Sequence, residues 1–254
     1  MRIARVQAGD GAQWAIVENY AVFRLEGSPW DQPRKGDRLG DLASARLLAP
    51  CQPTKIICIG LNYRAHAAES GQEVPAEPLM FLKPPTSVVG PNDDVVWAPG
   101  SERIDYEAEL AVVFKKQAKY IPPGAYKEYV LGYTCANDIS ARDFQRGDGQ
   151  WARAKGSDTF CPLGPWIETD VDPGSLRITG KLNGQVKQDS STADLAFNVD
   201  ALITHLTKYF TMEPGDVLIT GTPAGIGPMN PGDEYEIIIE GIGSLKNRMR
   251  KPES

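Results

Sequence analysis

The stretch DYEAELAVVF (residues 105–114) ends in β-branched and aromatic residues that are typical of a buried β-strand. Side chains on a strand repeat every two residues, so we expect Glu107 and Glu109 on one face and their neighbours on the other. Two like charges side by side repel each other, and sheet packing does not require them. A divalent cation would neutralise that repulsion.

The segment NDISARDFQ (residues 137–145) supplies a third acid, since Asp138 follows another strand-like run over residues 129–134. Two or three carboxylates, with the remaining positions left to water or substrate, are typical of a magnesium or manganese site. Three carboxylates around one dication leave a net charge of about −1. Arg142 and Lys155 are the cations available to balance it.

Each of these motifs also has an ordinary structural explanation. A Glu-x-Glu pair on a strand can line a solvated face. The acid of Asn-Asp-Ile-Ser can cap a turn or a helix, as Asn, Asp and Ser all do. A third segment therefore helps to decide between a metal site and these structural explanations.

That third segment is KIICIGLNYRAHAAE (residues 55–69), an apolar strand that ends at Gly60. Asn62 is a plausible N-cap for a short Ala-rich helix. His66 and Glu69 stand three positions apart, so they share a helix face and can touch. A carboxylate beside an imidazole orients it for general-base catalysis. The alternative is an exposed helix histidine with an incidental acid nearby.

Composition narrows the class of protein. The 254 residues can bury one large core, or one core plus a small appendage. The net charge is −6 and no basic run occurs, so nucleic acid and anionic membranes are poor partners. No secretory or transmembrane segment is expected. The four cysteines show no Cys-x-x-Cys spacing, which favours a reducing cytoplasm.

Short apolar segments bounded by turn residues recur along the chain and predict an α+β fold that is mainly β. Residues 1–50 are expected to form a small β subdomain and residues 51–254 the catalytic domain. Within the subdomain we expect strands over residues 2–7, 13–18 and 21–25, then a charged, irregular stretch over 34–49.

The second half carries clearer local signals. Asn183-Gly184 is a strong hairpin turn, and residues 198–210 have the apolar spacing of an amphipathic helix. Two closing strands, 217–220 and 235–239, enclose the loop GTPAGIG (residues 221–227). Its glycines run into prolines instead of a helix, which rejects a dinucleotide-binding loop. Its backbone N–H groups could still bind a carboxylate.

Together these segments resemble the fumarylacetoacetate hydrolase family, and in particular its bacterial acylpyruvase and 2-hydroxyhepta-2,4-diene-1,7-dioate isomerase-like members. The resemblance runs in order from about residue 55 to the C-terminus, and residues 1–50 match only loosely. It is carried by these motifs: GLNYxxHxxE (60–69), FxKP (81–84), DYExEL (105–110), NDxSxRxxQ (137–145), KGxDTF (155–160), GTPxGIG (221–227) and GIGxLxN (241–247).

The resemblance implies a mixed β-roll or sandwich with short flanking helices, a homodimer, and Mg²⁺ or Mn²⁺ held by Glu107, Glu109 and Asp138. It implies a catalytic dyad of His66 and Glu69 on a mobile lid. It also implies that Lys155 is a catalytic lysine. The substrate-binding residues that it implies are Lys83, Arg142, Gln145 and Thr222.

The function implied is metal-dependent chemistry on 2-keto and 1,3-diketo acids through an enolate that the metal stabilises. The leading reaction is carbon–carbon hydrolysis of an acylpyruvate of the fumarylpyruvate type, with His66 activating water. Lys155 and Gln145 would stabilise the oxyanion, and Lys83 would bind the distal end of the substrate.

Other functions stay open. The same residues would serve a 2-hydroxyhepta-2,4-diene-1,7-dioate isomerase or decarboxylase in aromatic catabolism, or an oxaloacetate decarboxylase. A different class is a non-catalytic, metal-dependent ligand-binding protein, which would have no need of His66 or Lys155. A phosphoesterase with two metal ions would normally need more ligands than three carboxylates.

Overall fold

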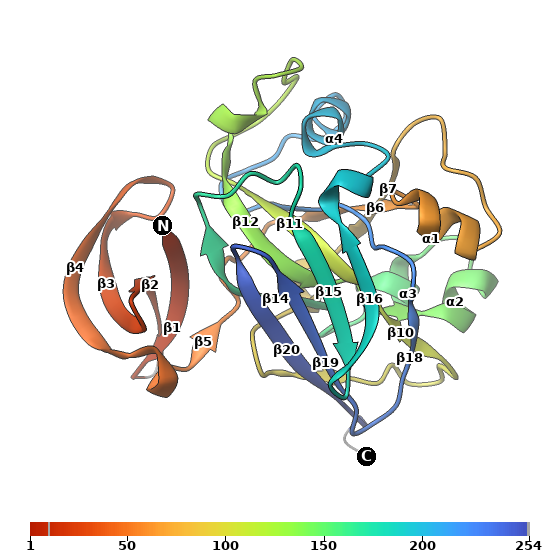
Figure 1. Ribbon diagram of the computed structural model, residues 1–254, viewed down its shortest axis with the longest axis horizontal. Helices are drawn as coiled ribbons and strands as arrows, with labels where there is room; N and C mark the ends of the chain where they lie inside the picture. Colours follow the sequence, from red (N-terminus) through yellow and green to blue (C-terminus); the bar gives the residue numbers. More distant parts are fainter. Residues whose placement is uncertain (10, 253–254) are drawn as a thin grey trace.

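Strands dominate the structure, and the helices are few and short, so the predicted α+β, mainly β fold is confirmed. The computed structural model describes residues 1–9 and 11–252. The strands form three sheets: a large one of twelve strands, one of five strands and a small one of three. Figure 1 shows the N-terminal strands to one side of the main body.

The N-terminal unit is an antiparallel meander whose first strand also pairs with β14 (Cys161–Glu168) of the main body. It therefore extends the large sheet. Its strands are β1 (Arg2–Ala8), β2 (Gly11–Glu18), β3 (Ala21–Ser28), β4 (Asp31–Asp41) and the short β5 (Leu47–Leu48).

The prediction of an irregular stretch over residues 34–49 is wrong for its first part, because β4 extends to Asp41. Its charged side chains hid the strand, since an edge strand can expose charge on both faces while its backbone pairs with one neighbour. Lys35 illustrates this: its ammonium pairs with Glu18 and lies over the Phe23 ring.

An interior strand of the large sheet is β11 (Ala108–Phe114), which pairs with β12 on one side and β17 on the other. Every residue of β11 is buried, which explains its uninterrupted apolar run. The other main-body strands of this sheet are β6 (Ile56–Gly60), β7 (Leu79–Lys83), β8 (Val88–Val89), β12 (Val130–Asn137), β14 and β17 (Val217–Ile219).

The main core lies between the large sheet and the five-stranded sheet. Leu110, Val112 and Phe114 of β11 belong to it, together with Ile178 and Ile237 of the second sheet. The predicted hairpin at Asn183-Gly184 is confirmed within that sheet. Its strands, in spatial order, are β16 (Gln185–Ser191), β15 (Arg177–Leu182), β19 (Glu234–Ile239), β20 (Gly243–Arg250) and β9 (Asp94–Val96).

Two elements of the structure differ from expectation. Helix α4 (Val199–Leu206) is capped by the Asn198 side chain, which accepts from the Ala201 amide at 2.9 Å, but it ends before residue 210. The last strand, β20, was not expected at all. Its alternation of buried Leu245, Asn247 and Met249 with exposed or half-buried residues is a period-two pattern.

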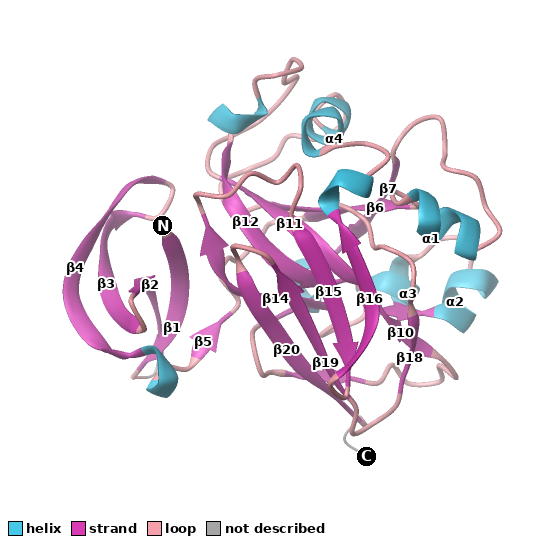
Figure 2. Cartoon of the chain, viewed as in Figure 1, coloured by secondary structure: helices cyan, strands magenta, loops and turns pink. Residues whose placement is uncertain are grey.

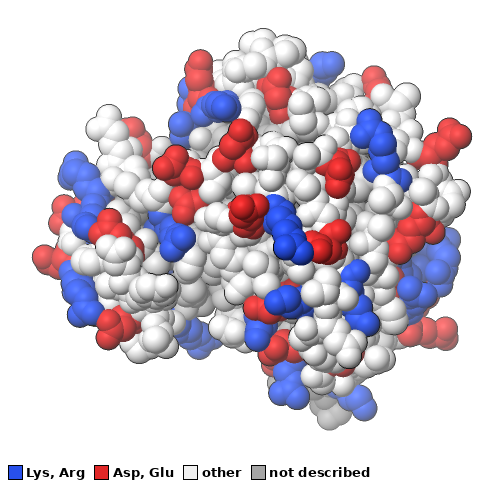
Figure 3. All heavy atoms as spheres, viewed as in Figure 1, with Lys and Arg blue, Asp and Glu red and all other residues white. Residues whose placement is uncertain are grey.

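Three short helices gather at one side of the molecule, beside the small sheet (Figure 2). They are α1 (Arg64–Glu69), α2 (Arg142–Gly147) and α3 (Ala152–Gly156), and the small sheet contains β10 (Ile104–Tyr106), β13 (Ser140–Ala141) and β18 (Gly227–Met229). Among the described residues no helix has the length and hydrophobicity needed to cross a membrane. Both signs of charge are scattered over the face in Figure 3.

Candidate active site

The structure brings Glu107, Glu109 and Asp138 together, each almost fully buried. One ligand oxygen from each lies within 4.8 Å of the others. Strand register causes this: Ala108 pairs with Asn137 across β11 and β12, and the Asp138 amide donates to the Glu107 carbonyl at 3.0 Å. Glu107 itself lies in the break between β10 and β11, so it is not part of one continuous strand.

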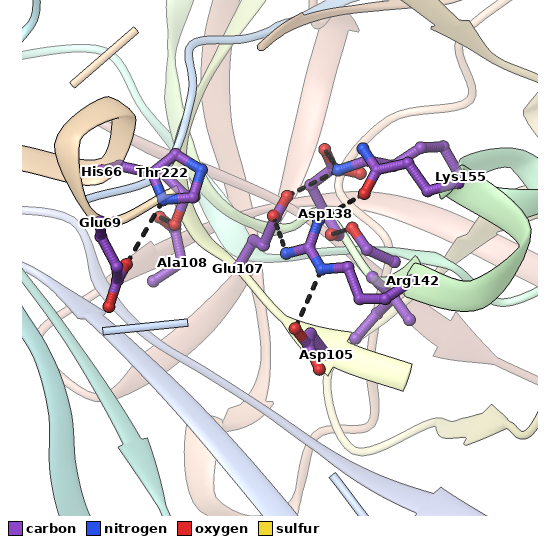
Figure 4. Close-up of polar contacts among 12 residues, drawn as sticks. His66, Glu69, Asp105, Glu107, Ala108, Asp138, Arg142, Lys155 and Thr222 are labelled. Carbon is purple, nitrogen blue, oxygen red and sulfur yellow. Dashed lines mark hydrogen bonds and ion pairs between the residues drawn. The ribbon is translucent and has the colours of Figure 1, made fainter. Parts of the chain in front are cut away.

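Two cations hold Glu107 from different helices (Figure 4). Lys155 of α3 donates to Glu107 Oε2 and to Asp138 Oδ2, both at 2.7 Å, and Arg142 of α2 donates to Glu107 Oε1. Burial alone would raise the pKa of Glu107, but Arg142 and Lys155 lower it below its usual range. Burial would lower the pKa of Lys155, which Asp138 and Glu107 instead raise.

Glu109 has a different electrostatic setting. Burial, and then the charges of Asp138 and Glu107, raise its pKa well above the ordinary value. The Gly221 amide donates to its Oε2 atom. An all-oxygen set of three crowded carboxylates fits a hard divalent cation, which would supply the positive charge that favours ionised Glu109.

Asp105 is a buried anchor that the sequence analysis quoted but gave no role. It accepts from Arg142 Nε at 2.9 Å and from Arg103 Nε at 2.8 Å. Arg142 also donates through Nη1 to Gln145 at 2.9 Å. The Nε, Nη1 and Nη2 atoms of Arg142 therefore all donate to protein groups. Arg142 positions Glu107 and adds positive potential to the cavity wall.

Lys83 does not reach the substrate cavity, which corrects its assignment to the distal end of the substrate. Its side chain is fully buried, and its ammonium lies 2.7 Å from Asp138 Oδ1. It also donates to the carbonyl oxygens of Ile139, Phe160 and Lys155. A lysine that satisfies three carbonyls and a carboxylate beneath the site supports Asp138 and has no free donor for a ligand.

Helix α1 presents His66 and Glu69 on one face, as their spacing predicts, with His66 Nδ1 3.6 Å from Glu69 Oε2 (Figure 4). His66 is buried and Glu69 is partly exposed. The expected N-cap is wrong: the helix begins after Tyr63, and Asn62 bonds elsewhere. The Asn62 amide joins this segment to residues 197 and 220, donating to both carbonyls and accepting from the Phe197 amide.

The glycine-containing loop at residues 220–227 leads to a strand, β18, in agreement with the rejection of a dinucleotide-binding helix. Its amides bind the protein's own carboxylates. Gly221 donates to Glu109, and Gly225 donates to both oxygens of Glu69 at 3.1 Å. Gly225 has a φ of +98°, and a Cβ atom there would lie 2.0 Å from the Lys187 carbonyl oxygen. Only glycine fits that position.

Gln188 of β16 is a fully buried residue that the sequence analysis missed. Its Oε1 accepts from the Ala108 amide at 2.9 Å and from the Tyr235 hydroxyl at 2.6 Å. Its Nε2 donates to Thr222 at 2.8 Å and to the Pro223 carbonyl at 2.7 Å. The sequence gives no local signal for this role, because a glutamine among polar residues looks like a surface residue and nothing local identifies its four partners.

Thr222 lines the cavity, yet its hydroxyl already donates to the Ala108 carbonyl at 3.0 Å and accepts from Gln188. The cavity has a volume of about 620 Å³ and also contains the carboxylates, Lys155, His66, Glu69 and Gln145 in its wall. Leu79, Phe81 and Trp151 add an apolar side. Nearly all the expected site residues thus meet in one cavity, with Lys83 beneath it.

Comparison with known proteins agrees with this architecture. The model of the fumarylacetoacetate (FAA) hydrolase C-terminal family matches residues 55–250, and that of an Rv2993c-like N-terminal family matches residues 1–50. The chain belongs to the fumarylacetoacetate hydrolase family. The resemblance read from the motifs is therefore confirmed, and the chain is a member of a family of enzymes.

Similar members of the fumarylacetoacetate hydrolase family carry different names. Protein Rv2993c of Mycobacterium tuberculosis is 41% identical over 257 residues, covering 97% of this chain and 97% of that protein. A crystal structure of 2-hydroxyhepta-2,4-diene-1,7-dioate isomerase from Mycobacterium marinum is 40% identical, with a TM-score of 0.92 and 100% of both chains covered. The mitochondrial oxaloacetate tautomerase FAHD2A of Bos taurus is 41% identical over 215 residues, covering 80% of this chain and 68% of that protein.

Proposed function

We propose that this chain hydrolyses the carbon–carbon bond of an acylpyruvate, of the fumarylpyruvate type, with the help of Mg²⁺ or Mn²⁺. One observation carries the proposal: a single cavity contains the acidic triad, Lys155 and a histidine–carboxylate pair. A pocket built only to bind a keto acid would need the first two features. A general base with its own orienting acid is what the activation of a water molecule would use.

Glu107, Glu109 and Asp138 would hold the divalent cation, because their oxygens lie close together and are the donor type that such ions prefer. A cation bound there would act as a Lewis acid toward the 2-oxo acid and stabilise negative charge on the enolate of pyruvate. Lys83, Lys155 and Arg142 keep the carboxylates in position through ion pairs from three sides.

His66 would take a proton from water as that water attacks the distal carbonyl carbon of the acylpyruvate. Glu69 would orient the imidazole and stabilise the imidazolium that forms. The bond from that carbonyl carbon to the methylene carbon of the pyruvate part then breaks, and its electron pair goes to the enolate. Return of the proton to the methylene carbon yields pyruvate and a carboxylic acid from one water.

Lys155 and Gln145 are the donors available to the oxyanion formed during this attack. Lys155 lies on the cavity wall between two of the carboxylates. Gln145 uses its Oε1 atom for Arg142, which leaves its Nε2 donors for a ligand. One such donor is commonly worth ~3 kcal/mol in the transition state.

Isomerisation of 2-hydroxyhepta-2,4-diene-1,7-dioate is the second candidate, favoured by the full-length similarity to a protein of that name. It also needs a base, but it moves a proton without attack by water. Oxaloacetate chemistry is a third, supported by the similarity to a tautomerase. The homodimer and the cytoplasmic location remain predictions.

Steady-state turnover of acylpyruvates, oxaloacetate and the dienedioate tests the proposal, with Mg²⁺, with Mn²⁺ and with EDTA. We expect metal-dependent hydrolysis and a loss of about 10²–10⁴-fold in His66→Ala. Oxaloacetate decarboxylation needs no attacking water, so it should survive this substitution better. Metal and oxalate binding should stay nearly intact, because His66 is not among the three carboxylate ligands.

His205→Ala is the matched control, since it removes the only other histidine of the chain. His205 lies on α4 against Tyr209, outside the cavity. This variant should hydrolyse acylpyruvates at the wild-type rate. If the wild-type protein hydrolyses no acylpyruvate with either metal but isomerises the dienedioate, the hydrolase proposal is wrong and the isomerase takes its place.

A further inference from the structure

The cavity changes character from its floor to its mouth. The acidic triad and Lys155 at the floor are almost fully buried. Phe81 and Trp151 are half-buried and meet edge to face, with their ring centroids 5.2 Å apart. Arg146, which also lines the cavity, is exposed. The cavity therefore combines buried charged groups, half-buried aromatic rings and an exposed cation.

Helix geometry explains the place of Arg146. It follows Arg142 by four positions in α2, so both side chains lie on the face that lines the cavity. One helical turn advances ~5.4 Å along the axis. Arg142 contacts Glu107 and its side chain is mostly buried, whereas Arg146, about one turn later, is exposed and so lies nearer to solvent.

The acids nearest to Arg146 in sequence have other partners. Asp148 accepts two hydrogen bonds from Arg153, at 2.6 and 2.7 Å. Asp143 accepts from the Ser101 hydroxyl at 2.7 Å and from the Glu102 amide at 3.0 Å. Among residues 1–9 and 11–252, Arg146 forms no ion pair with any carboxylate. Its guanidinium is thus available to a ligand.

The charges of the site also favour a second anionic group. Five carboxylates and five cations line the cavity or contact it from beneath, so these side chains balance when all five carboxylates are ionised. A divalent cation adds two positive charges. The carboxylate of a pyruvate unit offsets one of them, and a second carboxylate would offset the other. The groups counted are Glu69, Asp105, Glu107, Glu109 and Asp138, with Lys83, Arg103, Arg142, Arg146 and Lys155.

We propose that Arg146 binds the distal carboxylate of an acylpyruvate of the fumarylpyruvate type and so determines the preference of the enzyme for substrates with a second acid group. This inference rests on the proposed function for the orientation of the substrate. Arg146 takes the place that Lys83 cannot fill. The chain between the two acids lies against Phe81 and Trp151, and the guanidinium offers a carboxylate two parallel N–H donors.

The kinetic test compares succinylpyruvate with butanoylpyruvate, in which a methyl group replaces the distal carboxylate. Wild-type protein should prefer succinylpyruvate in kcat/KM. Arg146→Gln should raise KM for succinylpyruvate about tenfold with little change in kcat, and Arg146→Lys should recover part of the loss. Butanoylpyruvate kinetics should be unchanged. Equal effects on both substrates, or no effect on either, would overturn the proposal.

A binding test separates this inference from the reaction itself. Calorimetry with Mg²⁺ present compares 2-oxoadipate with 2-oxohexanoate, in which a methyl group replaces the distal carboxylate. Arg146→Gln should weaken 2-oxoadipate about tenfold and leave 2-oxohexanoate unaffected. If no acylpyruvate is hydrolysed but this difference appears, the proposed reaction fails and the carboxylate site stands. If wild-type protein shows no preference for 2-oxoadipate, the carboxylate site fails.

Arg24→Gln is the matched control for both tests. Arg24 is an exposed arginine on β3, in the N-terminal unit, and it does not line the cavity. The substitution changes the net charge of the protein by the same amount as Arg146→Gln. Any loss shared by the two variants measures general electrostatics, whereas a loss confined to Arg146→Gln measures the local contact.

Discussion

The backbone amide of Gly225 donates to both carboxylate oxygens of Glu69, at 3.1 Å each. This contact joins the helix that carries His66 to the loop whose Gly221 amide binds Glu109. The same two segments are joined again by Asn62, which donates to the Thr220 carbonyl at 2.7 Å. One short loop therefore binds both Glu69, on the helix of the proposed base, and Glu109, a proposed metal ligand.

The Glu69–Gly225 contact should hold residues 61–76 closed over the cavity. Asn62 and Tyr63 are buried at the start of this segment, but most of the rest is exposed and α1 buries only His66 and Ala67, so beyond residue 63 few other contacts hold it in place. In Glu69→Ala we expect amide hydrogen exchange to be a few-fold faster across the segment. Oxalate should slow exchange there in the wild-type protein.

The control for the lid is Glu73→Ala, which removes another exposed acid of the same segment. Its exchange should match that of the wild-type protein. Equal protection of residues 61–76 with and without oxalate would argue against a lid that closes on ligand.

Asp138→Asn should weaken Mg²⁺ and Mn²⁺ binding at least about tenfold, measured by calorimetry, because it removes one of three charged ligands. Thermal stability should also fall, since Lys83 and Lys155 lose a buried counter-charge. Asp189→Asn is the control: Asp189 is an exposed acid that pairs with Arg177 away from the cavity. Unchanged metal affinity in Asp138→Asn would remove Asp138 from the ligand set.

Gln188→Leu should destabilise the protein by about 3 kcal/mol, because it leaves several buried polar groups without partners. Metal affinity should fall as well, since Thr222 and the loop that positions Glu109 lose their support. Gln188→Glu keeps the acceptor oxygen for Ala108 and Tyr235. Its loss of stability should therefore be smaller than that of Gln188→Leu if these acceptor contacts contribute most of the stabilisation.

The exposed Gln185 of the same strand provides the control, and Gln185→Leu should leave stability and metal affinity unchanged. Denaturant unfolding and calorimetry measure the two quantities separately. A destabilised Gln188→Leu protein with wild-type metal affinity would show that Gln188 supports the fold without positioning Glu109.

Asp216 should make folding stability depend on pH. Burial would raise its pKa, but hydrogen bonds from Lys55, the Glu213 amide and Thr54 lower it below the ordinary value. The folded protein therefore binds this proton less readily than the unfolded chain does. The stabilisation is present above the unfolded pKa of about 3.9 and is lost as pH falls through the folded pKa.

Asp216→Asn should accordingly lower the free energy of unfolding by about 1–3 kcal/mol at neutral pH. The difference from wild type should shrink below about pH 4, where Asp216 becomes protonated in the unfolded chain. Asp37→Asn, at an exposed position on β4, is the control and should follow the wild-type curve. A difference that stays constant down to acid unfolding would contradict this role of Asp216.

Local pattern was enough for much of the fold. The apolar run of β11, the turn at Asn183-Gly184 and the amphipathic spacing of α4 each reflect interactions between residues close in sequence. Such interactions are visible without a structure. The strand β4 was missed because its charged residues obscure the strand pattern. Its pairing with β3 depends on the backbone of another strand, which the local sequence does not reveal.

The candidate site shows the same division between features that local sequence predicts and features that only tertiary contacts determine. Glu107, Glu109, Asp138, His66 and Glu69 belong to motifs whose residue types suggest their chemistry, and the sequence by itself identified them and the family. The tertiary structure alone determined that Lys83 lies beneath the triad, that Gln188 joins four backbone and side-chain groups, and that Arg146 lines the cavity without an ion pair to any carboxylate in the described part of the chain. Those roles depend on contacts between residues many positions apart, and the register of neighbouring strands and helices sets such contacts, which no local sequence pattern records.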